Sequence, residues 1–434
     1  TIDGRPSDRV AGLAKAKGWR QVPVNAAMPA LRGRQRASGL GIYPKQGAEG
    51  QLYHHRRVLQ DGDLVLLVNT RIDKPAAGSV VGNKVNGMQE WDLNTGKVEK
   101  LKTVREGSRL NYDFELPPCG SLLLFVSKTQ LEDSPAAEGK PAKIASDAPV
   151  EIKRLDPNVL TLDYTDVSCR GETKKSMPAI KAGHWVFSKH GIDRNPWAGA
   201  VQFKDTLITK TFPADSGFEA SYRFTIEEKV PASLFAVVER ADLYAIACNG
   251  TPVKPGPEWY LDKAFGKIDI ASAAKVGDNV LTIKAAPMTM YHELEAAYLI
   301  GEFSLKAVER GFAIVPETPL KLGPWNDQGC KLYGHRVSYK QKFDVSSKSG
   351  TYRVTLPNWY GSAAKVVVNG KPAGYIGWQP WACDVTEQIV NGSNEIEVIV
   401  FGTLRNMLGP CHQPQLGLAW PGMWDNDPDN GPPA

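Results

Sequence analysis

The chain has 434 residues, of which 42% are hydrophobic and 23% charged, proportions typical of globular domains and far from those of disordered chains. Its longest apolar runs are about five residues, whereas a membrane-spanning helix needs about 20, so no membrane span is expected. The 52 basic and 47 acidic residues leave a net charge of +5 that is spread along the chain, which argues against a nucleic-acid partner. Forty-one glycines and 31 prolines favour short strands joined by turns, and we therefore expect an all-β protein.

The N-terminal part of the chain is predicted to hold a connecting segment, 1–37, and a small β-sandwich, 38–128. In the connecting segment, Asp8 can cap a short helix that would end near Trp19. In the sandwich, an Asp-Gly turn interrupts the apolar stretch 58–68, which is a strong hairpin signal. Further strands are expected over 97–104, 110–116 and 121–126.

A linker is predicted over 129–147, because this segment is rich in Ala, Pro, Lys, Ser and Asp and lacks apolar periodicity. Beyond it, apolar and polar residues alternate in three short segments, which is typical of strands with one buried face. These segments are 222–226, 352–356 and 396–400.

One sequence plan occurs twice beyond the linker, over 243–283 and over 365–400. Each copy has an apolar strand that ends in Asn-Gly, a tryptophan nine or ten residues later, an Asp-centred segment, and a Gly-x-Asn turn that leads into an alternating strand. Asn-Gly supplies the two positive-φ residues of a tight hairpin turn. We therefore expect a jelly-roll-like antiparallel sandwich in each of the regions 148–310 and 311–434.

The second copy resembles the galactose-binding-like β-sandwich domains of large glycoside hydrolases through its Val-Asn-Gly turn, tryptophan, Asp-Val-Thr segment and Gly-x-Asn turn. A wider succession of motifs, over roughly residues 20–415, resembles the C-terminal part of bacterial α-L-rhamnosidase-like glycoside hydrolases. These motifs are His54-His55-Arg56-Arg57, the strand 64–69, Trp91-Asp92 with Thr95-Gly96, the segment 293–303, and Gly402-Thr403-Leu404-Arg405-Asn406 with Leu408-Gly409-Pro410 and His412.

The resemblance implies an accessory, carbohydrate-contacting part of an exported enzyme, extracellular or periplasmic, that hydrolyses O-glycosidic bonds in plant-type or microbial polysaccharide. Family members carry a (β/α) barrel with the catalytic carboxylates ahead of these sandwiches, and this sequence does not show eight alternating strand and helix segments. A catalytic barrel domain or chain is therefore an expected partner. The alternative is a non-catalytic carbohydrate-binding or surface-adhesion protein, and coding sequence for a barrel directly upstream of Thr1 would distinguish the two.

Glu293 and Glu295 are the candidates for catalysis within the chain itself. Glycoside hydrolysis needs two carboxylates about 5 to 9.5 Å apart across the scissile bond. Two residues apart on a strand, these side chains would share one face and perturb each other's pKa. The alternative is a strand that pairs both carboxylates with Arg or Lys.

Candidate sugar-binding residues gather near the C-terminus, where six of the eleven tryptophans occur from residue 325 onward. Aromatic rings stack on the apolar faces of sugars, while polar side chains bind the hydroxyls. The candidates are Trp359, Tyr360, Trp378 and Trp381 as stacking platforms in loops, with Arg405, Asn406 and His412 as hydrogen-bonding residues. The alternatives are rings that fill the core and polar residues that lock a loop.

The tail has alternating carboxylates, Asp425, Asp427 and Asp429, that resemble a calcium loop. Its glycine comes one place late, and no glutamate follows that could close the site. The alternative is a disordered acidic tail. A structural calcium ion elsewhere in the sandwiches is implied only by family habit, and no other cofactor is expected.

Overall fold

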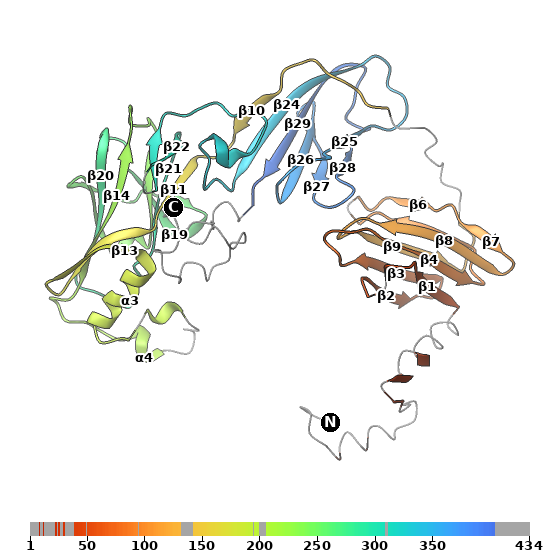
Figure 1. The fold of residues 1–434 in the computed structure, drawn as a ribbon, viewed down its shortest axis with the longest axis horizontal. Coiled ribbons are helices and arrows are strands. Elements are labelled where there is room, and N and C mark those ends of the chain that lie inside the picture. The colour runs from red at the N-terminus through yellow and green to blue at the C-terminus, as the bar shows by residue number, and fades with distance from the viewer. Residues whose placement is uncertain are drawn as a thin grey trace. The chain divides into compact units, whose positions relative to one another are not determined.

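The computed structural model describes residues 39–48, 50–93, 95–131, 142–193, 195–198, 205–308 and 311–403, with a few positions before 39. These residues are mostly β-strand, which confirms the all-β prediction (Figure 1). The chain divides into two compact units, Thr1–Lys143 with Gly377–Ala382, and Ile144–Ile376 with Cys383–Ala434. The helix expected between Asp8 and Trp19 lies almost wholly outside the described residues.

The first unit contains two antiparallel sheets, with strand orders β1-β4-β8-β7 and β2-β3-β9-β5-β6. The hairpin expected within 58–68 is confirmed, because β2 and β3 pair Val58 with Asp63. The strand expected over 97–104 is instead two short strands in different sheets, since Leu101 packs against the core between them. The strands are β1 (Leu40–Pro44), β2 (Leu52–Val58), β3 (Gly62–Asn69), β4 (Ala76–Asn83), β5 (Gly87–Trp91), β6 (Val98–Lys100), β7 (Val104–Glu106), β8 (Arg109–Leu116) and β9 (Ser121–Ser127).

Both sheets of the first unit contribute to one hydrophobic core. Val65 and Leu67 of β3 are fully buried, and the alternating residues Leu64, Leu66 and Val68 are partly exposed, because successive side chains of a strand point to opposite faces. Val80 of β4 and Leu124 of β9 belong to the same buried cluster. One face of each sheet is therefore committed to the core.

The second unit contains the remaining sheets, with orders β11-β21-β15-β19-β18, β13-β12-β14-β20-β16-β17, β10-β24-β29-β26-β27 and β25-β28. In the three larger sheets the described pairings are antiparallel apart from one parallel bridge between Ile226 and Ile314. The strands are β10 (Glu151–Arg154), β11 (Asn158–Leu162), β12 (Tyr164–Cys169), β13 (Glu172–Pro178), β14 (Phe218–Ile226), β15 (Leu234–Glu239), β16 (Ala245–Cys248), β17 (Thr251–Val253), β18 (Trp259–Tyr260), β19 (Asp262–Asp269), β20 (Gly277–Ala285), β21 (Ala297–Gly301), β22 (Ser304–Ala307), β23 (Phe312–Val315), β24 (Arg336–Val345), β25 (Arg353–Thr355), β26 (Ala363–Val368), β27 (Lys371–Ile376), β28 (Ala382–Asp384) and β29 (Gly392–Phe401).

The second unit also has helical segments, of which the longest was not expected from the sequence. They are α3 (Ala179–Lys189), η1 (Pro196–Ala198), α4 (Asp205–Ile208), η2 (Ala241–Leu243) and η3 (Trp325–Gln328). Helix α3 buries Val186 and Phe187 in the core. A Cβ on Gly183 would lie 2.7 Å from the carbonyl oxygen of Leu294, so only glycine lets the helix approach the segment before β21 so closely. This contact helps to place Glu293 and Glu295.

The two copies of the repeated plan form matching turns. Asn249-Gly250 joins β16 to β17, and Asn369-Gly370 joins β26 to β27, with φ values of 50° and 80° in the first turn and 52° and 75° in the second. Both residues of each turn are left-handed, as the Asn-Gly pattern predicts. The hairpins expected at these positions are therefore present.

The turn asparagine of each copy is hydrogen bonded to a buried asparagine, and we call this arrangement the asparagine clasp. The amide nitrogen of Asn249 donates to Oδ1 of Asn279 over 2.8 Å, and that of Asn369 donates to Oδ1 of Asn394 over 2.9 Å. Asn279 and Asn394 in turn bind the backbone of the Gly-x-Asn turn in which each lies. The sequence repeat is thus matched by the same set of side-chain bonds.

Strand β10 belongs to a sheet whose other strands come from much later in the chain. Glu151 pairs with Lys340 of β24, although the next strand, β11, joins a different sheet. Two ion pairs reinforce this crossing. Arg154 pairs with Glu317, and Arg336 pairs with Asp156 at 2.8 Å. The crossing ties the regions 148–310 and 311–403 together within the second unit.

Candidate functional site

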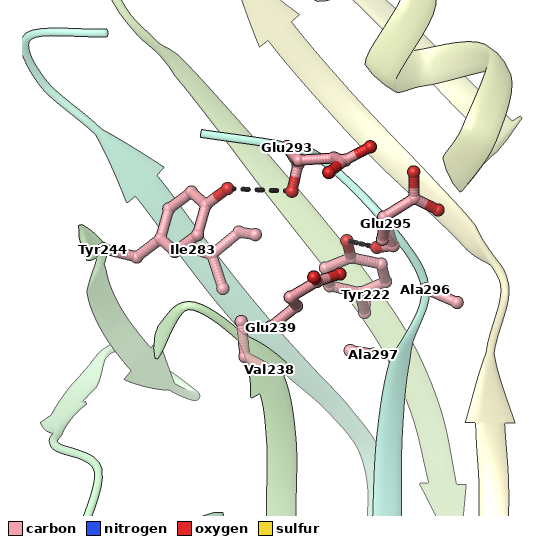
Figure 2. A pocket seen from close by; sticks show the side chains of 9 residues that line it. All are labelled: Tyr222, Val238, Glu239, Tyr244, Ile283, Glu293, Glu295, Ala296 and Ala297. Atoms are coloured by element: carbon pink, nitrogen blue, oxygen red, sulfur yellow. Dashed lines mark hydrogen bonds between the residues drawn. The ribbon is translucent and has the colours of Figure 1, made fainter. Parts of the chain in front are cut away.

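Glu293 and Glu295 line a small pocket at one end of the second unit's main core. Its other walls come from β14, β15, β20, the residue after η2, and the start of β21, through Tyr222, Val238, Glu239, Tyr244, Ile283, Ala296 and Ala297. Figure 2 shows the two glutamates along the segment that leads into β21, with Glu239 and the two tyrosine rings also lining the pocket. The pocket encloses about 200 Å³ including its open mouth, but it has room for about one water molecule.

The segment that carries the two glutamates is not a strand, contrary to expectation, because β21 begins only at Ala297. Two tyrosine hydroxyls bind its backbone instead of a neighbouring strand. The hydroxyl of Tyr244 donates to the carbonyl oxygen of Glu293 over 3.1 Å, and that of Tyr222 donates to the carbonyl oxygen of Glu295. Burial raises the pKa of both tyrosines far above the usual range, so they remain neutral donors.

The carboxylate of Glu293 accepts a hydrogen bond from the amide of Asn195 over 2.6 Å. The backbone N–H of Asn195 in turn donates to Nδ1 of His184 on α3, so the helix supports the carboxylate. Burial raises the pKa of Glu293, while the Asn195 hydrogen bond opposes the shift. The contact seen here is thus with an amide, whereas the sequence suggested a cation as the structural partner.

Glu239 at the end of β15 is a third carboxylate in this pocket, and sequence reasoning missed it. Burial is the main cause that raises the pKa of Glu239, and the negative charge of Glu293 raises it further. A pair of carboxyl groups with raised pKa values is a common feature of catalytic sites. A strand that ends in Glu beside an Arg has no distinctive sequence pattern. Glu239 comes close to Glu293 only through strand pairing between segments far apart in the sequence, which the local sequence does not reveal.

Aromatic and cationic side chains lie beside this pocket. The rings of Trp197 and Tyr291 are stacked with centroids 5.9 Å apart, and the guanidinium of Arg240 lies 5.7 Å from the Tyr291 ring. Tyr291 directly follows Met290, whose carbonyl oxygen accepts a 2.6 Å hydrogen bond from the Trp197 indole. The indole is therefore fixed in place.

The pocket is too small for glycoside hydrolysis in this conformation. The reaction requires a sugar ring between two carboxylates, whereas the space here accommodates about one water molecule. What the arrangement can do is favour the protonated form of the partly buried Glu239 and Glu293 and hold about one water molecule beside them. We therefore interpret the three glutamates as a polar end of the core.

The predicted stacking residues differ from one another in exposure. Tyr360 is 96% exposed and Trp378 is 50% exposed, whereas Trp359 and Trp381 are partly buried. Arg405, Asn406 and His412 lie outside the described residues, as do Asp425, Asp427 and Asp429. Within the described part of the chain, no group of three or more His, Cys, Asp or Glu side chains is arranged to hold a metal ion.

A further exposed tryptophan was not singled out from the sequence. Trp259 in β18 is 52% exposed and occupies the place in the sequence pattern of the first copy that Trp378 occupies in the second, although Trp378 lies outside any strand, in the segment Gly377–Ala382 of the first unit. The repeat itself was the signal that could have identified it. The structure therefore places one half-exposed indole in each copy.

No helix among the described residues is long and apolar enough to cross a bilayer.

No family model matches the chain. A curated protein of Formosa agariphila described as "Putative beta-glucuronidase" is 34% identical over 85 residues, which are 19% of this chain and 7% of that protein. The chain thus matches only a small part of that relative's length.

The solved structures that match the chain include several glycoside hydrolases. A rhamnosidase from Novosphingobium sp. PP1Y is 14% identical, with a TM-score of 0.23, over 67% of this chain and 28% of that enzyme. A β-glucuronidase from Ruminococcus gnavus is 10% identical, with a TM-score of 0.21, over 58% of this chain and 43% of that enzyme.

Proposed function

We propose that this chain is the accessory, carbohydrate-contacting part of an exported glycoside hydrolase that resembles the α-L-rhamnosidases. The enzyme would act on plant-type or microbial polysaccharide in an extracellular or periplasmic setting, with its catalytic barrel in another domain or chain. The order of motifs along the sequence and the local identity to a protein described as a glucuronidase support this setting. In this proposal the region 148–310 is a jelly-roll-like sandwich and the region 311–434 a galactose-binding-like sandwich.

The observation that carries the proposal is the half-exposure of two indoles, Trp259 and Trp378, which occupy matching places in the repeated sequence pattern. A core tryptophan would have most of its ring buried, and little of that ring would be available to a ligand. An exposed ring offers the flat apolar surface on which a sugar stacks. Tyr360, at 96% exposure, is a third such ring.

Binding of the full chain to an insoluble plant polysaccharide tests the proposal. Stacking on one ring contributes about 1 kcal/mol, so Trp259→Ala and Trp378→Ala should each weaken binding roughly fivefold. Because both rings are half-exposed, each variant should lose far less stability than the roughly 3 to 5 kcal/mol of a buried tryptophan. Tyr43→Ala, which removes a 42% exposed ring elsewhere, serves as the control and should bind normally.

The accessory role is tested separately by turnover of an aryl rhamnoside. We expect no turnover by the purified chain, because the glutamate pocket has no room for a sugar ring. Turnover that Glu293→Gln or Glu295→Gln abolishes would overturn the accessory role and assign catalysis to this pocket. Binding without a barrel encoded upstream would favour the alternative, a free-standing binding or adhesion protein.

A further inference from the structure

Strand β2 of the first unit presents three side chains in a row on the face turned away from the core. In the described structure, β2 lies at the edge of its sheet and pairs only with β3. Tyr53, His55 and Arg57 face Val68, Leu66 and Leu64 across this pairing. Because Val65 and Leu67 are fully buried, the residues that alternate with them point outward, and so do their partners on β2.

This row, which we call the β2 row, is open to solvent. The ring of Tyr53 is 61% exposed, and both His55 and Arg57 are exposed. Side chains two residues apart on a strand are separated by roughly 6.6 Å, so the row extends over about 13 Å. An extended ligand lying along the strand could contact all three side chains at once.

The β2 row carries positive charge that no neighbouring carboxylate is seen to neutralise. Arg56, on the core-facing side, pairs with Asp63 over 2.8 Å and so engages that carboxylate. Among the described residues, Arg57 forms no ion pair. Burial lowers the pKa of His54, and the positive charges of Arg56 and His55 lower it further. Arg57 is therefore the cation that the β2 row offers to a ligand.

An apolar surface lies beside the row on the same face of the sheet. Leu64, Leu66 and Val68 of β3 are partly exposed there. Beyond them, Phe125 is buried against Trp91, with ring centroids 5.4 Å apart, so the accessible apolar surface is that of Leu64, Leu66 and Val68. An aromatic ring, an imidazole and a guanidinium next to an apolar floor suit a ligand that has both apolar faces and negative charge. Saccharides that carry carboxylate or sulfate groups have both properties.

We propose that the β2 row binds an anionic saccharide, with Tyr53 stacked on a sugar ring and with His55 and Arg57 binding its carboxylate or sulfate group. This inference rests on the proposed carbohydrate-contacting function and assigns it a second surface and a ligand charge. The competing explanation is that basic residues on an edge strand only prevent sheets of different molecules from pairing.

Affinity electrophoresis of the full chain tests the inference with four probes: polygalacturonate, dextran sulfate, neutral dextran and double-stranded DNA. We expect one of the two anionic polysaccharides to retard the chain more than dextran does, and added salt to weaken that retardation. Arg57→Gln should weaken it about two- to fivefold, which corresponds to one exposed ion pair, and Tyr53→Ala by a similar factor. Arg109→Gln, which removes an equal charge from exposed Arg109 on β8, should have no effect.

The outcomes separate this inference from the proposed function. A stronger effect of polygalacturonate or of dextran sulfate identifies the anion as carboxylate or sulfate. If dextran retards the chain as much as the anionic polysaccharides do, the inference about the β2 row is overturned and the proposed function stands. If no polysaccharide retards the chain, both the inference and the proposed function are overturned. Equal binding to DNA would show a general polyanion surface, and equal effects of Arg57→Gln and Arg109→Gln would leave only edge protection. Either result overturns the inference.

Discussion

The asparagine clasp offers the sharpest test of how this fold is held together. Asn394 is fully buried, and its amide makes four hydrogen bonds of 2.9 Å. Oδ1 accepts from Asn369 and from the Val390 N–H, and Nδ2 donates to the carbonyl oxygens of Val390 and Gly392. Asn394→Ala would remove all four, at about 1 to 3 kcal/mol for each buried group left unpaired. Because water can reach the exposed turn, we expect a net loss of about 3 to 5 kcal/mol.

Asn394→Asp refines this test, since it preserves the shape and the accepting oxygen. In this variant an oxygen replaces Nδ2 and faces the carbonyl oxygens of Val390 and Gly392. This contact disfavours the charged form and raises the folded-state pKa of the new carboxyl group. A raised folded-state pKa means that stability is retained below the unfolded value of about 4 and is lost as the pH rises through the folded value. The variant should therefore be closest to the parent protein near pH 4 and least stable near neutral pH.

Urea and thermal unfolding of the full chain, followed by near-UV circular dichroism, would measure these losses. Asn279→Ala and Asn279→Asp are internal replicates, because Asn279 makes the corresponding bonds in the first copy. Ser393→Ala, at an exposed neighbouring position, is the control. A loss below about 1 kcal/mol for Asn394→Ala, or an equal loss for Ser393→Ala, would refute the reasoning, because four buried bonds cannot contribute so little.

Three further predictions concern the remaining buried polar groups. Burial and the charge of Glu293 raise the pKa of Glu239, so the charged form of Glu239 destabilises the fold above that pKa. Glu239→Gln should therefore raise the melting temperature near pH 7, and the gain should shrink toward pH 4. Tyr222→Phe should cost about 1 to 2 kcal/mol in urea unfolding, since it removes the hydroxyl bound to the Glu295 carbonyl; no loss would mean that water replaces it. A thiol reagent should label exposed Cys119 in the native chain much faster than Cys169, Cys248, Cys330 and Cys383, whose burial raises their pKa; equal rates measured by peptide mapping would contradict the packing.

The parts of the fold that sequence could predict are those determined over a few residues. The Asp-Gly hairpin of β2 and β3 and the two Asn-Gly turns follow from backbone preferences of adjacent residues. Strands β14 and β29 cover 222–226 and 396–400, but only β14 alternates in burial as expected, since residues 396–399 of β29 are all partly buried. Between 352 and 356 only Arg353–Thr355 is strand. The boundaries proposed for the domains stay predictions.

The pocket could be anticipated only in part, because its walls come together over long sequence distances. Glu293 and Glu295 were recognised as a pair from their spacing, but Glu239 reaches them only through the pairing of β15 with β21. Their segment is irregular since tyrosine hydroxyls bind its carbonyl groups. Helix α3 escaped notice because it is short and has Gly183 in its middle, where glycine weakens the helical signal.

The position of β10 has a consequence for any attempt to divide this protein. A fragment that began near residue 311 would lack the strand that covers β24, so the backbone groups of β24 now bonded to residues 151–154 would form an open edge. Open edges pair with strands of other molecules. Such a fragment should exchange strands or aggregate, whereas a longer fragment that begins before Glu151 carries its own cover. Strand β10 thus covers the edge of a sheet whose other strands follow about 180 residues later, and this long-range pairing should slow the closing of the sheet.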